Sequence, residues 1–271
     1  MAKKLSAEDR LIVALDTDDP VKALDIVRKL PKVKNYKIGL ELIFSILARL
    51  LSPKLSRQER ENNLRDAYRL FNSLRGLFLD AKLHDIPTTV VGAIRSIARL
   101  GVTMISVHCQ GKEKMMADAW RAAKETAERE FAPEAPASHP LILGVTLLTS
   151  LKASDFREWA GLRAEDIILD LALSAKDTGL DGVIASPLET ARIRRACGPN
   201  FVIVNPGICP NWALPNDQSR FGTPTEAIQN GADYLVVGRA ITNPPSEIGG
   251  IEKAADRVLE EMEEALTRRG A

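Results

Sequence analysis

The sequence predicts a single (β/α)8 barrel, a TIM barrel, over residues 1–271. The first observation is length, because 271 residues are ample for one large core and α/β barrels often reach this size as one domain. The second is that short apolar, β-branched runs alternate with amphipathic segments, which is typical of a parallel sheet covered by helices. The third is that eight such units follow one another, which favours a closed barrel over an open doubly wound sheet.

Continuous apolar runs mark the strands, since a barrel strand is buried on both faces. The expected strands are 10–15, 35–40, 76–82, 102–108, 141–148, 181–186, 201–205 and 233–238. Segments with an apolar face at helical spacing lie between them and are expected to cover the barrel. The expected helices lie near 20–30, 41–51, 58–75, 88–100, 112–130, 164–178, 188–197 and 224–230, with a final helix over about 248–268.

Three stretches interrupt this alternation. SPKLSRQERENNLRD, near 52–66, is polar and of mixed charge, and we expect an insertion that lengthens the helix layer before the third strand. FAPEAPASHP, at 131–140, is expected to be a linker before the fifth strand. NPGICPNWALPNDQSRFGTP, at 205–224, is long and rich in Pro, Gly and Asn, and we expect a mobile lid near 210–222.

Composition and charge exclude several classes of protein. The 37 basic residues balance 36 acidic ones, so no basic excess predicts binding to nucleic acid or to a membrane surface. The apolar run at 42–51 is too short to span a bilayer, and residues 1–10 lack the apolar stretch of a signal peptide. The three cysteines show no CxxC spacing, so we expect free thiols in a reducing compartment and a cytoplasmic protein. These cysteines are Cys109, Cys197 and Cys209.

A charged motif, LDAKLHDIPTTV, occupies residues 79–90 at the end of the third expected strand. Residues two apart on a strand face the same way, so Asp80 and Lys82 are expected to project together, with Asp85 close by. Asp85 alone has a second interpretation, as the N-cap of a helix that has Pro87 in its first turn.

Two further charges belong to the neighbouring strands. Asp16 ends the first expected strand, and Lys37 lies on the second. The chemistry of such barrels takes place at the C-terminal ends of the strands, so the four charges of Asp16, Lys37, Asp80 and Lys82 are predicted to meet at one rim. A salt-bridge network that merely closes the barrel is the alternative, but clustered charges at strand ends favour an active site.

The C-terminal part of the sequence, around the seventh and eighth expected strands, indicates a phosphate site. The loops after the seventh and eighth strands of such barrels often bind phosphate. VGRAI follows the eighth expected strand, where Gly238 permits close backbone approach and Arg239 offers a fork of donors. Gln218, in the expected lid, adds a neutral donor. A small phosphorylated molecule is therefore the predicted ligand.

These motifs resemble one family. FLDAKLHDIPTTV is similar to the D-x-K-x-x-D-I-P-x-T signature of the orotidine 5′-phosphate decarboxylase family. The resemblance continues in the order of the barrel and covers most of residues 10–243. It is carried by IVALD, YKIGLEL, GVTLLTS, VNPGICP, DQSRFGTPTEAI and NGADYLVVGRAIT. The chain departs from the family at Cys209, where bacterial members often have arginine, and at Thr88, where asparagine is common.

The resemblance implies decarboxylation of orotidine 5′-phosphate to UMP, the last step of de novo pyrimidine synthesis, without cofactor or metal. Lys82 would donate the proton to C6, and Asp80 would lie against the substrate carboxylate between Lys82 and Lys37. Asp85, accompanied by Thr89, would reach across a homodimer interface into the partner's site.

The resemblance also implies binding residues along the substrate. Asp16 and Lys37 would hold the ribose hydroxyls, and Thr149 and Ser150 would lie near the pyrimidine at the end of the fifth strand. The phosphate would be bound by Gln218, Gly238 and Arg239. Ile86 is expected to be a further substrate-binding residue.

Two other functions stay open from the sequence. One is a related metal-dependent sugar-phosphate decarboxylase or aldolase, because those barrels share the D-x-K-x-x-D motif. The other is a catalytically silent nucleotide-binding barrel. His84 is expected to pack against or cap a helix. His108, at the end of the fourth strand, is expected to be a satisfied core histidine, with a place behind the active-site residues as the alternative. No third ligand accompanies His108 and Cys109 as a metal site.

Overall fold

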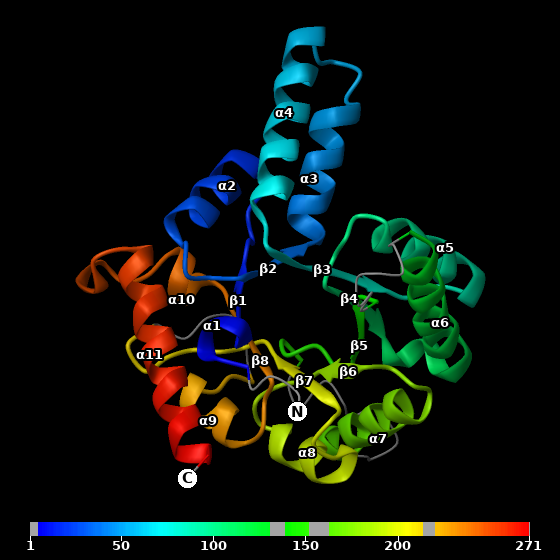
Figure 1. Cartoon of the computed structure of the whole chain (residues 1–271), viewed down its shortest axis with the longest axis vertical. Coiled ribbons are helices and arrows are strands. Elements are labelled where there is room, and N and C mark those ends of the chain that lie inside the picture. Colours follow the sequence, from blue (N-terminus) through cyan, green and yellow to red (C-terminus); the bar gives the residue numbers. More distant parts are fainter. Residues whose placement is uncertain (1–4, 131–138, 152–162, 214–219, 271) are drawn as a thin grey trace.

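The computed structural model describes residues 5–130, 139–151, 163–213 and 220–270. Eight parallel strands close into one barrel in sequence order, with β1 paired to both β2 and β8 (Figure 1). The strands are β1 Leu11–Ala14, β2 Asn35–Gly39, β3 Gly76–Leu83, β4 Met104–His108, β5 Leu141–Val145, β6 Gly182–Ile184, β7 Val202–Asn205 and β8 Tyr234–Val237. The chain is thus one α/β domain, and each of the eight predicted strands is confirmed, although β5 ends at Val145 rather than at 148.

Helices ring the barrel on its outside (Figure 1). They are α1 Ala7–Arg10, α2 Pro20–Lys29, α3 Leu40–Leu51, α4 Arg57–Ser73, α5 Pro87–Ala98, α6 Lys112–Glu130, α7 Ala164–Asp177, α8 Thr190–Cys197, α9 Pro224–Gln229, α10 Arg239–Thr242 and α11 Ile251–Gly270, with 3-10 turns at Cys109–Gly111 and Ser246–Ile248. The nine expected helices are present. The sequence did not predict α1 and α10, because four residues are too few to display a helical period.

Local sequence explains where several helices begin. Ser56 and Glu59 form a reciprocal capping box at the start of α4, and Thr223 and Glu226 form another at α9. Asp19 caps α2, because its side chain accepts a hydrogen bond from a backbone N–H of the first turn. The first residue of α2 is a proline, which suits this position because a residue there donates no intrahelical hydrogen bond from its backbone nitrogen.

Apolar side chains form two buried clusters. The smaller fills the barrel interior and consists of Ile12, Ala14, Phe78, Met104, Leu143, Val145, Ile184, Val204 and Val236. The larger lies between the strands and the surrounding helices. Because the interior is filled by side chains, the free volume that remains for a ligand is at the ends of the barrel.

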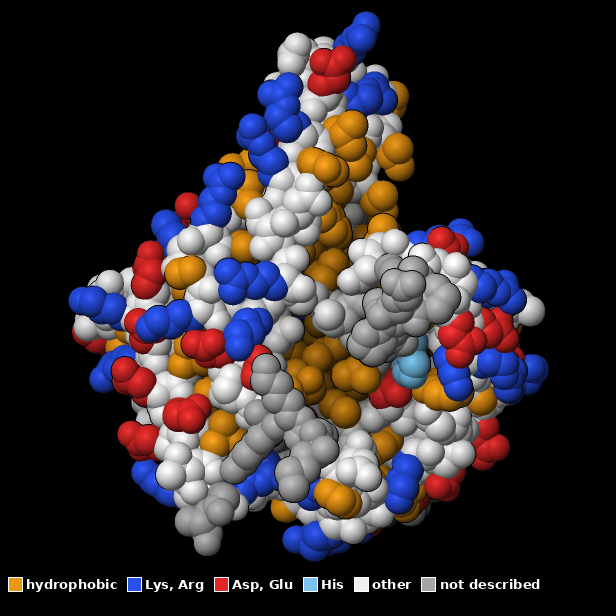
Figure 2. All heavy atoms as spheres, viewed as in Figure 1, with side chains coloured by type: hydrophobic (Ala, Val, Ile, Leu, Met, Phe, Trp, Pro, Cys, Tyr) orange, Lys and Arg blue, Asp and Glu red, His pale blue; other side chains and the backbone are white. Residues whose placement is uncertain are grey.

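The α3–α4 pair projects from the barrel as a helical hairpin (Figure 1). The polar stretch at 52–66 forms its tip and the first part of α4. Figure 2 shows apolar side chains along one side of this hairpin, continuing down into the hollowed centre of the face.

The three cysteines are free thiols, as predicted, and all are buried. Burial raises the pKa of Cys109 to about 12. Within the described part of the chain, no helix is both long and apolar enough to cross a membrane.

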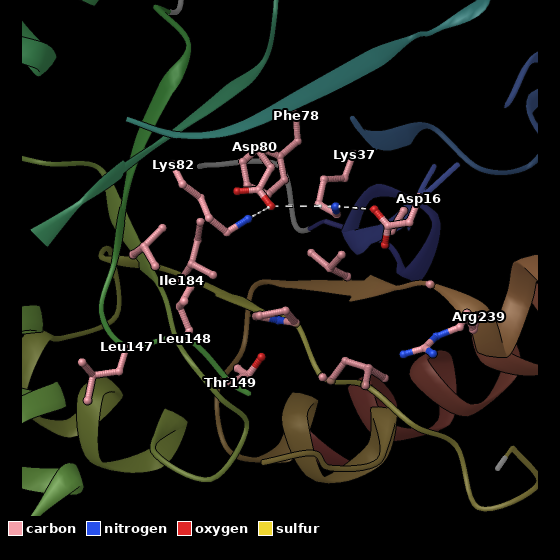
Figure 3. Close-up of a pocket in the computed structure, with 17 residues that line it drawn as sticks. Asp16, Lys37, Phe78, Asp80, Lys82, Leu147, Leu148, Thr149, Ile184 and Arg239 are labelled. Atoms are coloured by element: carbon pink, nitrogen blue, oxygen red, sulfur yellow. Dashed lines mark hydrogen bonds and ion pairs between the residues drawn. The ribbon is translucent and has the colours of Figure 1, made fainter. Parts of the chain in front are cut away.

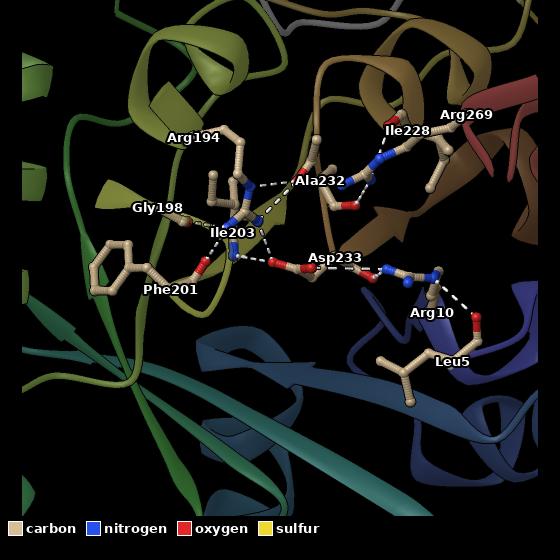
Figure 4. A network of polar contacts seen from close by, with 11 residues as sticks. Leu5, Arg10, Arg194, Gly198, Phe201, Ile203, Ile228, Ala232, Asp233 and Arg269 are labelled. Carbon is tan, nitrogen blue, oxygen red and sulfur yellow. Dashed lines mark hydrogen bonds and ion pairs between the residues drawn. The ribbon is translucent and has the colours of Figure 1, made fainter. Parts of the chain in front are cut away.

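An arginine network joins the strands at the N-terminal end of the barrel (Figure 4). Arg194 of α8 donates to the Asp233 carboxylate at 2.5 Å and to the Gly231 carbonyl at 2.8 Å. It also donates to the carbonyls of Gly198 and Phe201, both at 2.7 Å. These acceptors precede β7 and β8, so one guanidinium satisfies the backbone where both strands begin.

Replacing Arg194 by alanine is expected to lower the free energy of unfolding by about 3 kcal/mol, because it removes the cation paired with a partly buried carboxylate and takes a donor from several carbonyls. Urea denaturation followed by tryptophan fluorescence measures this change. Arg268→Ala is the control, since Arg268 pairs with Glu264 on the exposed face of α11 and its removal should have little effect. Equal losses in the two variants would mean that the network does not hold the strands.

Candidate active site

A cavity opens at the C-terminal ends of the strands (Figure 3). Its floor is the upper layer of the barrel interior, namely Ala14, Phe78, Val145, Ile184 and Val236. Its charged or polar side chains are Asp16, Lys37, Asp80, Lys82, Thr149 and Arg239, and loop residues Leu147, Leu148, Pro206, Gly207, Ile208 and Gly238 complete the wall. The cavity is therefore apolar below and strongly charged at its rim.

Four of the predicted charges form a row along one side of this cavity (Figure 3). The Lys82 ammonium lies 2.5 Å from Asp80 Oδ2, and the Lys37 ammonium lies 3.8 Å from the same oxygen. Lys37 also donates to Asp16 Oδ1 at 2.8 Å. The row alternates in sign, which stabilises charges that would be costly to bury singly.

Burial is uneven along the row. The side chains of Asp80 and Lys37 are only 9% and 12% exposed, whereas that of Asp16 is 55% exposed. A charge with little water around it acts strongly on its neighbours, because the local dielectric is low. Asp80 and Lys37, at the middle of the row, are therefore the charges least screened by water, and Lys82 extends from Asp80 into the cavity (Figure 3).

The predicted phosphate end lies across the cavity from Lys82 (Figure 3). Arg239 begins α10 directly after Gly238, and both line the cavity. Gly207, on the loop after β7, has φ of 77°, a left-handed conformation that favours glycine and brings the backbone to the wall. Cys209, where the chain departs from the family pattern, is buried and does not line the cavity. Among the described residues that line the cavity, Arg239 is therefore the single arginine that can contact a phosphate.

Several predicted residues lie elsewhere. Asp85, Ile86 and Thr89 are exposed and do not line the cavity of their own chain. The Asp85 side chain accepts a hydrogen bond from the Ile86 N–H at 2.6 Å, and it makes no cap to α5, whose N-cap is Ile86. The N-cap interpretation of Asp85 is therefore wrong.

The loop after β5 carries two other predicted residues. Thr149 and Ser150 lie four and five residues beyond the end of β5 at Val145, not at the end of the strand. Thr149 lines the cavity, whereas Ser150 is exposed and does not. Gln218 and the centre of the predicted lid, 214–219, lie outside the described residues, as does most of the linker at 131–140.

Two histidines lie beside the charged row. The rings of His84 and His108 are 5.5 Å apart, and His84 is exposed. His108 Nδ1 is buried and has no hydrogen-bond partner among the described residues, so it is not the satisfied core histidine that the sequence predicted. Burial, and then the nearby His84 and Lys82, lower the pKa of His108. Across the described residues, no three His, Cys, Asp or Glu side chains converge as a metal site.

Sequence reasoning missed an ion pair beside the loop after β7. Arg220 contacts Glu189, which is almost wholly buried at the start of α8. Burial raises the pKa of Glu189, and Arg220 opposes that effect. On the same loop, Cys209 N–H donates to the Gly222 carbonyl at 3.0 Å and Gly222 N–H to the Gly207 carbonyl at 3.1 Å. The described ends of the loop are thus fixed to one another.

Comparison with known proteins assigns the family. The model of the "Orotidine 5'-phosphate decarboxylase / HUMPS family" matches residues 9–253. The chain belongs to this family. An orotidine 5′-phosphate decarboxylase of Syntrophotalea carbinolica is 42% identical over 265 residues, which are 97% of this chain and 98% of that protein. One of Nostoc sp. is 42% identical over 238 residues, 87% of this chain and 91% of that protein.

A solved structure agrees with the family and with the barrel. The crystal structure of orotidine 5′-phosphate decarboxylase from Lactobacillus acidophilus matches with a TM-score of 0.69 and 31% identity, over 94% of this chain and 99% of that one. The orotidine 5′-phosphate decarboxylase family is therefore the one that the D-x-K-x-x-D motif at Asp80, Lys82 and Asp85 had indicated.

Proposed function

We infer that this chain is a carboxy-lyase that converts orotidine 5′-phosphate to UMP and CO2 in pyrimidine biosynthesis. Relatives of about 40% identity over nearly the whole chain carry this activity in their names. The observation that carries the chemistry is the row of Asp16, Lys37, Asp80 and Lys82 along one side of the cavity, opposite Arg239.

We propose that Lys82 performs the proton transfer. The bond from C6 to the carboxylate carbon breaks, its electron pair stays on C6, and neutral CO2 leaves. No ring carbonyl is placed to delocalise that pair, so a fixed ammonium must stabilise it and then protonate it. Lys82 is held by Asp80 at 2.5 Å and projects into the cavity, which suits both tasks. Solvent then returns a proton to the neutral amine.

Asp80 has a second role in this proposal. Its carboxylate would face the substrate carboxylate, and the repulsion between them disappears when CO2 departs. Lys37 and Lys82 flank Asp80 and keep the row ionised when the substrate enters.

The rest of the cavity suits the rest of the nucleotide. Asp16 and Lys37, joined at 2.8 Å, would hold the ribose hydroxyls, and Thr149 would lie by the pyrimidine. Arg239 and Gly238 would bind the phosphate, and Gln218 and Ser150 stay predicted contacts. Phosphate is remote from C6, so its binding energy is available to hold the reacting end against Lys82.

An ultraviolet assay of orotidine 5′-phosphate with purified protein tests the function. We expect the substrate absorbance to fall at an unchanged rate in EDTA. Loss of the activity in EDTA would favour the metal-dependent sugar-phosphate enzymes, and no turnover in either buffer would favour the silent nucleotide-binding barrel.

We propose further that the enzyme is a homodimer whose partner supplies Asp85, with Thr89 and Ile86, to each site. All three are exposed and outside the cavity of their own chain. Ile86 is 64% exposed, and the exposed apolar residues of α3 recur at helical spacing on one face of the projecting hairpin. They are Leu40, Phe44, Leu47 and Leu51. An apolar face continuous with the cavity mouth (Figure 2) suits a second copy of the chain.

Arg239→Ala is expected to lower kcat/KM about 100-fold, mostly through a higher KM, because a charge-assisted contact to phosphate contributes roughly 3 kcal/mol. Steady-state kinetics on orotidine 5′-phosphate measure the loss. Orotidine without phosphate is the matched control, since its slow turnover should be nearly the same in both proteins. If kcat/KM falls equally for both substrates, Arg239 is structural and the phosphate assignment is wrong.

A further inference from the structure

The strand that carries Asp80 and Lys82 is irregular where they lie. Residues Phe78 and Leu79 of β3 pair with Met104 and Ile105 of β4, but the next pair is Leu83 with Val107. Three residues of β3, namely Asp80, Ala81 and Lys82, therefore face the single residue Ser106 of β4. Such a bulge redirects side chains, and bulges are often found next to active sites.

The backbone of the bulge is strained at Lys82. Its φ is 47°, in the left-handed region that residues other than glycine rarely adopt. A conformation of this kind persists only where the surroundings hold it.

Ser106 makes the two contacts that fix this bulge. Its hydroxyl accepts a hydrogen bond from the Lys82 backbone N–H at 2.8 Å and donates one to Asp80 Oδ1 at 2.8 Å. A hydroxyl has one donor and two acceptor sites, so both bonds form together. Ser106 is 0% exposed, and water cannot take over either bond. Asp80 is left with Oδ2 for the Lys82 ammonium, at 2.5 Å.

We propose that Ser106 is a positioning residue of the decarboxylation site. One hydroxyl ties the backbone of the proton donor to the side chain of its carboxylate neighbour, and so aims both groups into the cavity. The inference rests on the proposed roles of Lys82 and Asp80. Ser106 does not line the cavity, so it acts through these two residues and not on the substrate.

Substitution by threonine and by valine isolates the hydroxyl, because the two side chains fill the same volume and differ in that group. We expect Ser106→Thr to retain a kcat at least 10-fold above that of Ser106→Val, and Ser106→Ala to lose 10- to 100-fold in kcat. A displacement of the reacting groups by about 1 Å is enough for such losses. KM and the affinity for UMP should change less than about threefold, because Arg239 and Lys37 are untouched.

Thr103→Val is the matched control. Thr103 directly precedes β4, at the other end of the same pair of strands, and its hydroxyl donates to the Leu77 carbonyl at 3.0 Å. Its loss should leave kcat unchanged. Equal kcat in the threonine and valine variants would overturn the inference, as would a parallel fall of kcat, UMP affinity and melting temperature in Ser106→Ala. An inactive wild-type protein would instead refute the proposed function.

Discussion

Lys82→Ala is expected to lower kcat about 10^5-fold, roughly 7 kcal/mol, because in the proposed mechanism one ammonium both stabilises the developing carbanion and protonates it. General acid catalysis and a preorganised charge each raise the rate of the chemical step in enzymes by several orders of magnitude, and here both contributions would be lost with one side chain. Single-turnover decarboxylation of orotidine 5′-phosphate measures the loss. Affinity for UMP should fall less than about 10-fold, since the phosphate end of the cavity does not involve Lys82.

Two further variants sharpen this expectation. Lys82→Arg keeps the positive charge but does not release a proton near neutral pH, so it should be nearly as inactive as the alanine variant. Lys114→Ala removes an exposed lysine that pairs with Asp118 on α6, and it should leave kcat unchanged. A Lys82→Ala enzyme with a kcat within 10-fold of wild type would show that another group protonates C6.

The barrel was predictable because its strands carry an unambiguous pattern. A strand buried on both faces reads as an unbroken apolar run, as LIVA in β1 and YLVV in β8 do. The end of β5 was less predictable, since LILGVTLL is interrupted only by Gly144 and Thr146, yet β5 ends at Val145 and Leu148 is exposed on the loop. An apolar run therefore does not show where the hydrogen-bonded ladder of a strand ends.

The charged row was predictable, but its geometry was not. Strand alternation places Asp80 and Lys82 on one side, and the two do meet. They meet through a bulge with a left-handed lysine, which depends on a residue of β4 and so is invisible in the sequence of β3. The signal that sequence reasoning missed is Ser106, a lone hydroxyl within the apolar strand MISVH, where a buried polar group must have partners.

The position of Asp85 follows from the same local geometry. After Leu83 the chain leaves β3, and α5 begins at Pro87, so Asp85 lies on a short connection at the rim. Its exposure and its absence from the cavity lining motivate the proposal that each site is completed by the partner chain. In a two-fold dimer each chain then gives one Asp85 and receives one.

Mixing the inactive variants Lys82→Ala and Asp85→Ala is therefore expected to restore activity. In a mixed dimer one site collects both substitutions and the other collects neither. With random exchange at equal amounts about half of the dimers are mixed, so activity should reach about a quarter of wild type. Lys82→Ala mixed with Lys37→Ala is the control, because both residues line the cavity of their own chain and no intact site can form. Recovery in neither mixture, once subunit exchange is verified, would mean that each site is built from one chain.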